Sequence, residues 1–111
     1  MSASYTIKKT TYGKYFFNME ADNNEKVLTS ETYNSKQRVL DGIASVRNNS
    51  AMDSRYERKT STRNQPYFVL KAANGEPIGR SEEYSSVQAG EHGIQVVKTI
   101  GPKAPIRDLT N

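Results

Sequence analysis

Residues 16–25 read FFNMEADNNE and residues 67–76 read YFVLKAANGE, so the two stretches match at a separation of 51 residues. The same separation aligns residues 5–47 with residues 56–98 without a gap and gives fifteen identities. Similarity at one fixed period over such a length indicates an internal duplication. The fold is therefore expected to contain two similar copies of one structural unit.

A copy of about fifty residues is marginal as an independent domain, because it buries too little of its own surface. We therefore expect the two copies to share one core. The prediction is a single domain, residues 1–111, with repeat 1 at about residues 4–54 and repeat 2 at about residues 55–111.

Each repeat is predicted to contain three strands followed by a helix. Alternating apolar residues mark the strands, Asn74-Gly75 is typical of a tight hairpin, and Asn24 has to accept the same positive φ in repeat 1. Apolar residues at helical spacing mark the helices, which Ser35 or Asn34 and Ser86 or Ser85 can cap. The predicted strands are 5–10, 15–21, 26–32, 55–62, 67–72, 77–83 and 105–110, and the helices end near residues 50 and 101.

The order of these elements predicts an α+β fold. The strand after the first helix already opens repeat 2, so by symmetry the C-terminal strand should return to repeat 1 and pair beside residues 5–10. We expect a tandem duplication of a β3-α-β repeat, forming a single antiparallel sheet with two helices on one face and swapped C-terminal strands. Gly42 and Gly93 occupy equivalent helical positions, and they indicate a close approach of each helix to the sheet or to the other helix.

Composition restricts the classes of function. Hydrophobic residues make up 34% of the chain, mean hydropathy is −0.82, and there is no cysteine. Disulfides and thiolate metal sites are therefore excluded, and no cofactor is expected. No apolar run reaches the roughly 18 residues that span a bilayer, and the first residues lack the apolar core of a signal peptide. We expect a cytoplasmic protein with no membrane partner.

Three motifs, in order, carry a resemblance to a known family: residues 67–76, then SEEYSS at residues 81–86, then GIQVVK at residues 93–98. With these motifs the chain resembles the YegP family of small bacterial proteins of unknown function. The resemblance covers nearly the whole chain, and repeat 1 carries it in weaker form, with Asn24 where the family usually has glycine. It implies two β3-α-β repeats with exchanged C-terminal strands, and it implies no activity, cofactor or site residues.

No catalytic motif is present. His92 is the one histidine, and no nucleophile is placed near it by any pattern, so an exposed helical side chain is the better interpretation. The recurring Ser30-Glu31 and Ser81-Glu82 pairs, each followed by a tyrosine, are better explained as a turn that both repeats make. Glu31, Glu82 and His92 are the remaining acid–base candidates of an enzyme hypothesis, and we predict that the protein is not an enzyme.

The sheet face away from the helices is the predicted interaction surface, with Phe16, Lys59, Arg63, Tyr67, Val69 and Lys71 as candidates. We expect the aromatic and apolar members to be exposed there, which favours a monomeric, non-enzymatic module that binds a protein partner. The alternative is nucleic-acid binding through a basic face. Net charge is +4, and Arg55, Arg58, Lys59 and Arg63 lie close together in sequence, although such a run is more often a solvated strand.

Overall fold

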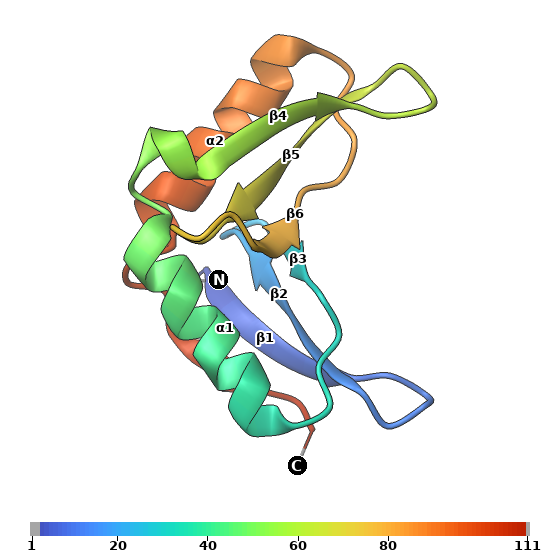
Figure 1. Cartoon of the computed structure of the whole chain (residues 1–111), viewed down its shortest axis with the longest axis vertical. Coiled ribbons are helices and arrows are strands. Elements are labelled where there is room, and N and C mark those ends of the chain that lie inside the picture. The colour runs from blue at the N-terminus through green and yellow to red at the C-terminus, as the bar shows by residue number, and fades with distance from the viewer. Residues whose placement is uncertain (1–2, 111) are drawn as a thin grey trace.

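The computed structural model describes residues 3–110, and three residues of the predicted domain 1–111 lie outside this range. Within this range the chain forms seven strands and two α-helices, and Figure 1 shows how they are arranged. Their bounds are β1 Ser4–Lys9, β2 Tyr15–Glu20, β3 Lys26–Ser30, α1 Lys36–Asn49, η1 Asp53–Arg55, β4 Tyr56–Thr60, β5 Pro66–Lys71, β6 Pro77–Arg80, α2 Val87–Ile100 and β7 Ile106–Asp108. The predicted order βββα–βββα–β is confirmed, with the third strand of each repeat ending earlier than expected.

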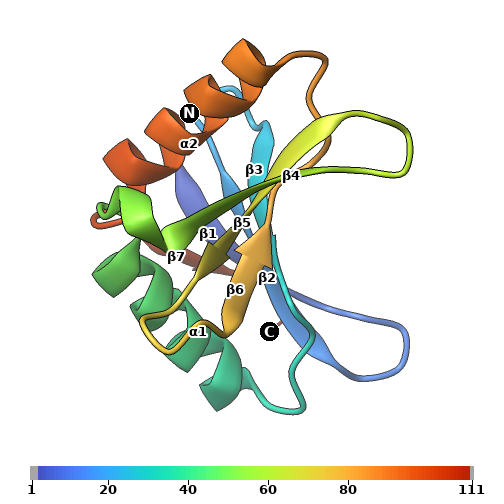
Figure 2. The ribbon, with the colours of Figure 1, turned by 45° about the horizontal axis from the view of Figure 1, so that its top comes forward.

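All seven strands belong to one sheet with the order β4-β5-β6-β3-β2-β1-β7. The two repeats meet where β3 pairs with β6, through Thr29 with Arg80 and Ser30 with Gly79. Both helices cover the same side of the twisted sheet (Figure 2). The predicted α+β fold with two helices on one face is therefore confirmed.

The C-terminal strand β7 pairs with β1, as the exchange of strands requires, but it runs parallel to β1. The prediction of a purely antiparallel sheet is wrong at this one pair. The chain leaves α2 at Gly101, whose carbonyl accepts a hydrogen bond from the Tyr5 hydroxyl at 2.5 Å. It therefore reaches the N-terminal end of β1, where the Tyr5 N–H donates to the carbonyl of Pro105 at 2.8 Å. From that end a strand can only continue in the direction of β1.

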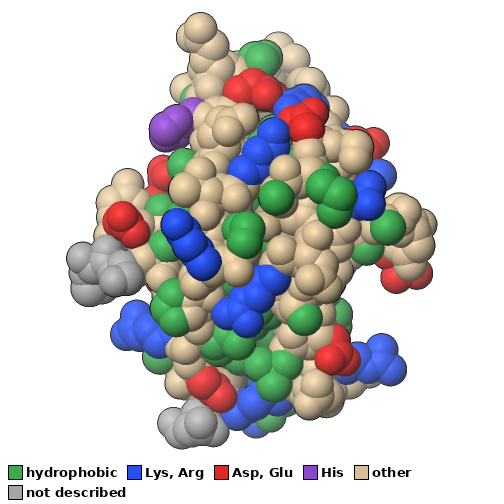
Figure 3. Space-filling model, turned by 90° about the vertical axis from the view of Figure 1, so that its left-hand side faces the viewer, with side chains coloured by type: hydrophobic (Ala, Val, Ile, Leu, Met, Phe, Trp, Pro, Cys, Tyr) green, Lys and Arg blue, Asp and Glu red, His purple; other side chains and the backbone are tan. Residues whose placement is uncertain are grey.

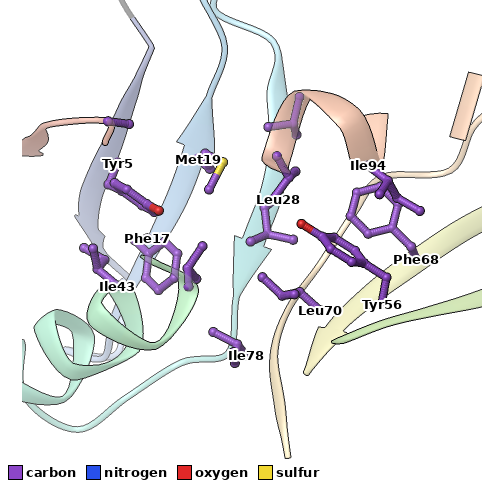
Figure 4. Packing of buried hydrophobic residues seen from close by; sticks show 14 of the residues in the cluster. Tyr5, Phe17, Met19, Leu28, Ile43, Tyr56, Phe68, Leu70, Ile78 and Ile94 are labelled. Carbon is purple, nitrogen blue, oxygen red and sulfur yellow. The ribbon is translucent and has the colours of Figure 1, made fainter. Parts of the chain in front are cut away.

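The core is shared between the repeats. Helix α1 packs on β2 and also on β5 and β6 of repeat 2, while α2 packs on β5 and on β3 of repeat 1. Figure 4 shows Leu28 and Ile78 between the group around Phe17 and the group around Phe68. Because each helix buries side chains of the other repeat, the two copies cannot be separated into complete globules.

Two tyrosines tie each repeat to the helix of the other. The Tyr5 hydroxyl of repeat 1 donates to Gly101 at the end of α2, and the Tyr56 hydroxyl of repeat 2 donates to the carbonyl of Ser50 at the end of α1, at 2.7 Å. Positions 50 and 101 are equivalent at the repeat separation, and the ends of the two helices touch there. The duplication thus produces reciprocal hydrogen bonds.

Local features agree with the sequence. Ser35 and Ser86 cap the helices by accepting from backbone N–H groups three residues on. Asn24 and Gly75 both have positive φ, at 67° and 87°, as a tight turn between these strands requires.

The equivalent helix glycines of the two repeats reflect close packing. A Cβ on Gly93 would lie 2.2 Å from the Tyr84 hydroxyl, and one on Gly42 would lie 3.0 Å from the Tyr33 hydroxyl. The expected close approach of helix and sheet is confirmed, with a tyrosine filling the space above each glycine.

Candidate interaction surface

Side chains on the face of the sheet away from the helices, here called the open face, gather on repeat 2. Phe68 and Leu70 of β5 point into the core, so their neighbours along the strand, among them Tyr67 and Val69, point to the open face. Val69 lies opposite Arg80 of β6 on one side and Glu57 of β4 on the other. These neighbours surround a hollow of about 270 Å³, called the repeat-2 hollow, which is lined by Glu31, Glu57, Lys59, Tyr67, Val69, Lys71, Gly75, Pro77 and Arg80.

Two lysines hold one carboxylate at the wall of this hollow. Lys71 forms an ion pair with Glu57, and Lys59 lies 3.9 Å from the same carboxylate. The hydrogen bond from Lys71, together with the charge of Lys59, lowers the pKa of Glu57. Glu57 therefore stays ionised at neutral pH and offsets part of the positive charge that the sequence suggested for this strand.

Arg80 supplies the cation at the junction between the repeats. Its guanidinium carbon lies 5.1 Å from the centre of the Tyr67 ring, a distance typical of a cation–π contact. Within residues 3–110 no carboxylate within ion-pair distance of Arg80 is found. A guanidinium stacked on a ring keeps its N–H donors available for a carboxylate or a carbonyl group.

The equivalent region of repeat 1 is closed. Lys8 and Glu20 form an ion pair at 3.5 Å, and along the strands they flank the pair formed by Thr6 and Asn18. Thr6 and Asn18 are buried although they face away from the helices, and the Asn18 side-chain amide donates to the Thr29 hydroxyl at 2.8 Å. Repeat 1 thus satisfies its own polar groups, and repeat 2 leaves its counterparts accessible.

The structure brings together four of the six predicted surface residues: Lys59, Tyr67, Val69 and Lys71. Phe16 lies away from these four residues, opposite Lys8 on repeat 1. Arg63 also lies outside the hollow, in the β4–β5 hairpin, where it pairs with Glu83 at 3.6 Å.

The expectation that the apolar members are exposed is wrong. Phe16, Tyr67 and Val69 are each partly buried, because a twisted sheet and long neighbouring side chains cover them. Sequence reasoning also missed Arg80. The signal was present, since position 80 is equivalent to Thr29 and is one of the places where the repeats differ in charge.

The basic run of β4 does not form a stripe. Arg58 points to the helix side of the sheet, where its guanidinium binds Glu91 at 2.6 Å and Asp53 at 3.0 Å. Hydrogen bonds from Lys98 and then Arg58 lower the pKa of Asp53 to about 2. Figure 3 shows the helix side of the molecule, where basic and acidic side chains are interspersed. Strand alternation therefore divides these charges between two faces.

The acid–base candidates do not come together. Ser30 and Ser81 each accept from the N–H of a β-strand phenylalanine at 2.9 Å and donate to the following carbonyl at 2.8 Å, so both serines have a structural role in the turn. Glu31, Glu82 and His92 are exposed. Among residues 3–110 no cluster of metal-ligating side chains is found, and no helix there has the length and hydropathy needed to cross a membrane.

Comparison with known proteins agrees with the duplicated architecture. A family model described as a domain of unknown function, DUF1508, matches the chain twice, at residues 11–57 and 61–108. The chain belongs to the DUF1508 family. The two matches begin about one repeat apart, so one match to the family model corresponds to one period of the duplication.

Curated and solved proteins of this family match nearly the whole chain. The chain is 51% identical over 106 residues to UPF0339 protein YegP of Yersinia pestis, covering 96% of this chain and 95% of that protein. It is 47% identical over 108 residues to a UPF0339 protein of Bordetella pertussis, with 97% of each chain covered. The solution NMR structure of the protein of unknown function yegP from E. coli matches with a TM-score of 0.92 and 41% identity, over 98% of this chain and 94% of that one. The resemblance to YegP is thereby confirmed.

Proposed function

We propose that this DUF1508 protein is a non-enzymatic module that binds a protein partner at the repeat-2 hollow. The observation that carries the proposal is the difference between the two open faces. The Lys8–Glu20 ion pair closes repeat 1, whereas repeat 2 presents Arg80 beside an aromatic ring. In the part of the chain that the structure describes, this arginine has no carboxylate within ion-pair distance.

The chemistry of the hollow indicates what it would bind. Arg80 can donate to a carboxylate, and the partly buried Tyr67 and Val69 offer apolar contact next to it. Tyrosine and arginine side by side are the residue types that contribute most to protein interfaces. An acidic group next to an apolar side chain is therefore the feature expected of the partner.

Nucleic-acid binding remains the second candidate, favoured by Lys59, Lys71 and Arg80 around one aromatic ring. Cations next to an aromatic residue can bind a phosphate and stack a base. Two carboxylates, Glu31 and Glu57, also line the hollow, and their charge opposes a polyanion. A protein partner is thus the better proposal. The monomeric state and the cytoplasmic location stay predictions.

Affinity capture followed by shift mapping tests the proposal. The wild type, a Tyr67→Ala/Arg80→Ser variant and a Lys103→Ser control are immobilised, and retained proteins are compared. Lys103 is exposed in the turn after α2, so it should not affect the site. A specific partner should be retained by the wild type and the control and lost from the double variant, and its amide shifts should map to the hollow.

Two results would contradict the proposal. One is a partner retained equally by the double variant. The other is binding of small metabolites near His92 or Glu82 in an NMR screen, because these acid–base candidates lie outside the hollow and such binding would favour an enzyme. A shift with DNA or RNA at low salt that disappears in Lys59→Glu would favour the second candidate.

A further inference from the structure

The two ends of the sheet are not equivalent, although the repeats are. Strand β1 of repeat 1 has a further neighbour, β7, whereas its counterpart β4 is the last strand at its end. A duplicated chain with a complete set of strands would carry an eighth strand beside β4. Among residues 3–110, the outer edge of β1 therefore has a neighbouring strand, and the equivalent edge of β4 has none.

The contacts of β7 define which backbone groups this position offers. Tyr5 and Ile7 face β7, because the Tyr5 N–H donates to Pro105 and the Ile7 carbonyl accepts from Leu109 at 3.0 Å. Their counterparts at the repeat separation are Tyr56 and Arg58. The Tyr56 N–H is used by η1, where it donates to Asp53.

At these two positions the carbonyl of Tyr56 and both backbone groups of Arg58 therefore remain for a new strand. No hydrogen bond of these groups to an element other than β5 is found in residues 3–110. An edge strand with outward N–H and C=O groups is a template for the addition of another strand.

A hollow lies beside this edge, on the helix side of the sheet. It measures about 150 Å³, is called the edge hollow, and is lined by Arg58, Lys59, Thr60, Pro66, Tyr67, Phe68, Val87, Gly90, Glu91 and Ile94. Its origin is a difference between the repeats, because Gly90 stands at the position of Val39, which is fully buried in α1. Cavities of about 150 Å³ accept a group the size of benzene, so one branched aliphatic side chain fits.

A second difference indicates which residue should enter. Beside repeat 1, the third residue of β7 is Asp108, which pairs with Lys36 of α1 at 2.9 Å. The counterpart of Lys36 is Val87, whose side chain is 69% exposed. The same position of a strand on β4 would thus meet Val87 and the edge hollow. The cation next to it, Arg58, also lines this hollow but already pairs with Glu91 and Asp53. An apolar residue is the matching choice.

We propose that the free edge of β4 binds an extended segment of a partner protein as an eighth, parallel strand, with an apolar side chain seated beside Val87. The residue that follows it lies opposite Lys59 and is acidic by charge complementarity. A second copy of β4 is a poor occupant, because antiparallel pairing would set two copies of Arg58 against each other. The two hollows share Lys59 and Tyr67, but Val87 and Gly90 line only the edge hollow, and Val69 and Arg80 line only the repeat-2 hollow. Changes at these unshared residues let either proposal fail alone.

The probe is a peptide based on this chain's own β7. It is the 104–110 sequence with Leu in place of Asp108 and Glu in place of Leu109, namely Ala-Pro-Ile-Arg-Leu-Glu-Thr. The control peptide is the unchanged 104–110 sequence, whose aspartate would meet Val87. Titration of labelled protein to about 1 mM peptide, an affinity range expected for a single short strand, should shift the amides of residues 56–60 and of Val87 and Gly90. The control peptide should bind about tenfold more weakly.

Three variants separate strand addition from other contacts. Arg58→Pro and Arg58→Ala both remove the guanidinium, but only proline removes the outward N–H, and proline is tolerated on an edge strand at such a position. Arg58→Pro should bind the probe about threefold to tenfold more weakly than Arg58→Ala, the loss expected for one hydrogen bond. Val87→Lys should reverse the preference, so that the unchanged peptide binds better.

The results that would overturn the proposal are distinct. They are absence of shifts at residues 56–60, equal affinity of the two Arg58 variants, or a dimer formed through β4 without peptide. Shifts confined to Val69 and Arg80 would overturn strand addition and support the repeat-2 hollow alone. If Arg58→Pro does not fold, Gly90→Val serves instead, because it fills the edge hollow and should abolish the difference between the two peptides.

Discussion

The contact between the two helix ends gives the sharpest prediction on stability. Gly101 follows α2 with helical φ and ψ, so a conformational need for glycine is absent at this position. A Cβ there would lie 2.4 Å from the Ser50 hydroxyl oxygen, 2.7 Å from the Ser50 Cβ and 2.7 Å from the Val97 carbonyl oxygen. We therefore predict that Gly101→Ala destabilises the protein by steric overlap.

The magnitude follows from opposing effects. Replacing glycine by alanine reduces the conformational freedom of the unfolded chain and would stabilise by about 0.4–1 kcal/mol if the site were open. Overpacking of a buried site costs about 1–3 kcal/mol. Any shift of residue 101 also weakens the hydrogen bond from Tyr5, a further cost of about 1 kcal/mol. The net expectation for Gly101→Ala is a loss of roughly 1–3 kcal/mol.

Urea unfolding followed by circular dichroism measures the effect, with Gly90→Ala as the matched control. A Cβ on Gly90 would meet its nearest atom, in the Tyr84 ring, at 3.6 Å, so this control should be more stable by up to about 1 kcal/mol. Ser50→Gly combined with Gly101→Ala should recover part of the loss, because the Ser50 overlap disappears and the Val97 contact stays. Gly101→Ala as stable as the wild type would refute the proposed contact between the helix ends.

Three further predictions concern the same architecture. Removal of residues 105–111 should lower stability markedly in thermal unfolding, because β7 takes the outward groups of β1, including the Tyr5 N–H, which bonds to Pro105; unchanged stability would contradict the strand exchange. Tyr56→Phe should cost about 1 kcal/mol through its lost hydrogen bond to Ser50, and a neutral result in urea unfolding would show that bond to be weak. The pKa values of Asp53 and Asp108 are lowered to about 2, Asp53 first by a hydrogen bond from Lys98 and Asp108 first by one from Thr110. The contribution of these aspartates to the free energy of unfolding is present above the unfolded pKa near 4 and is lost as pH falls to about 2. In an acid titration the free energy of unfolding should therefore decline over that interval, and it should decline less steeply in Asp53→Asn.

Tyr67 and Arg80 show how much of the candidate site could be predicted from the sequence. Period-two alternation placed Tyr67, Val69 and Lys71 on the open face, and the structure has them there. Arg80 was missed because β6 is short and its register with β5 is irregular next to Leu70. Which strands are neighbours across the junction of the repeats depends on long-range pairing, and no local pattern contains that information.

The amino-acid sequence alone determined the duplication, the element order, the cap residues and the return of the C-terminal strand to repeat 1. The duplication follows from the 51-residue period, and the strand return follows from the symmetry of that duplication. The element order and the caps follow from alternation, helical spacing and turn chemistry, which act over a few residues. Tertiary structure alone decided that β7 runs parallel to β1, that the Lys8–Glu20 ion pair closes one open face, and that Arg58 pairs with Glu91 and Asp53. The physical reason is that these contacts join residues far apart in sequence. Which of those residues come into contact is determined only when the shared core packs.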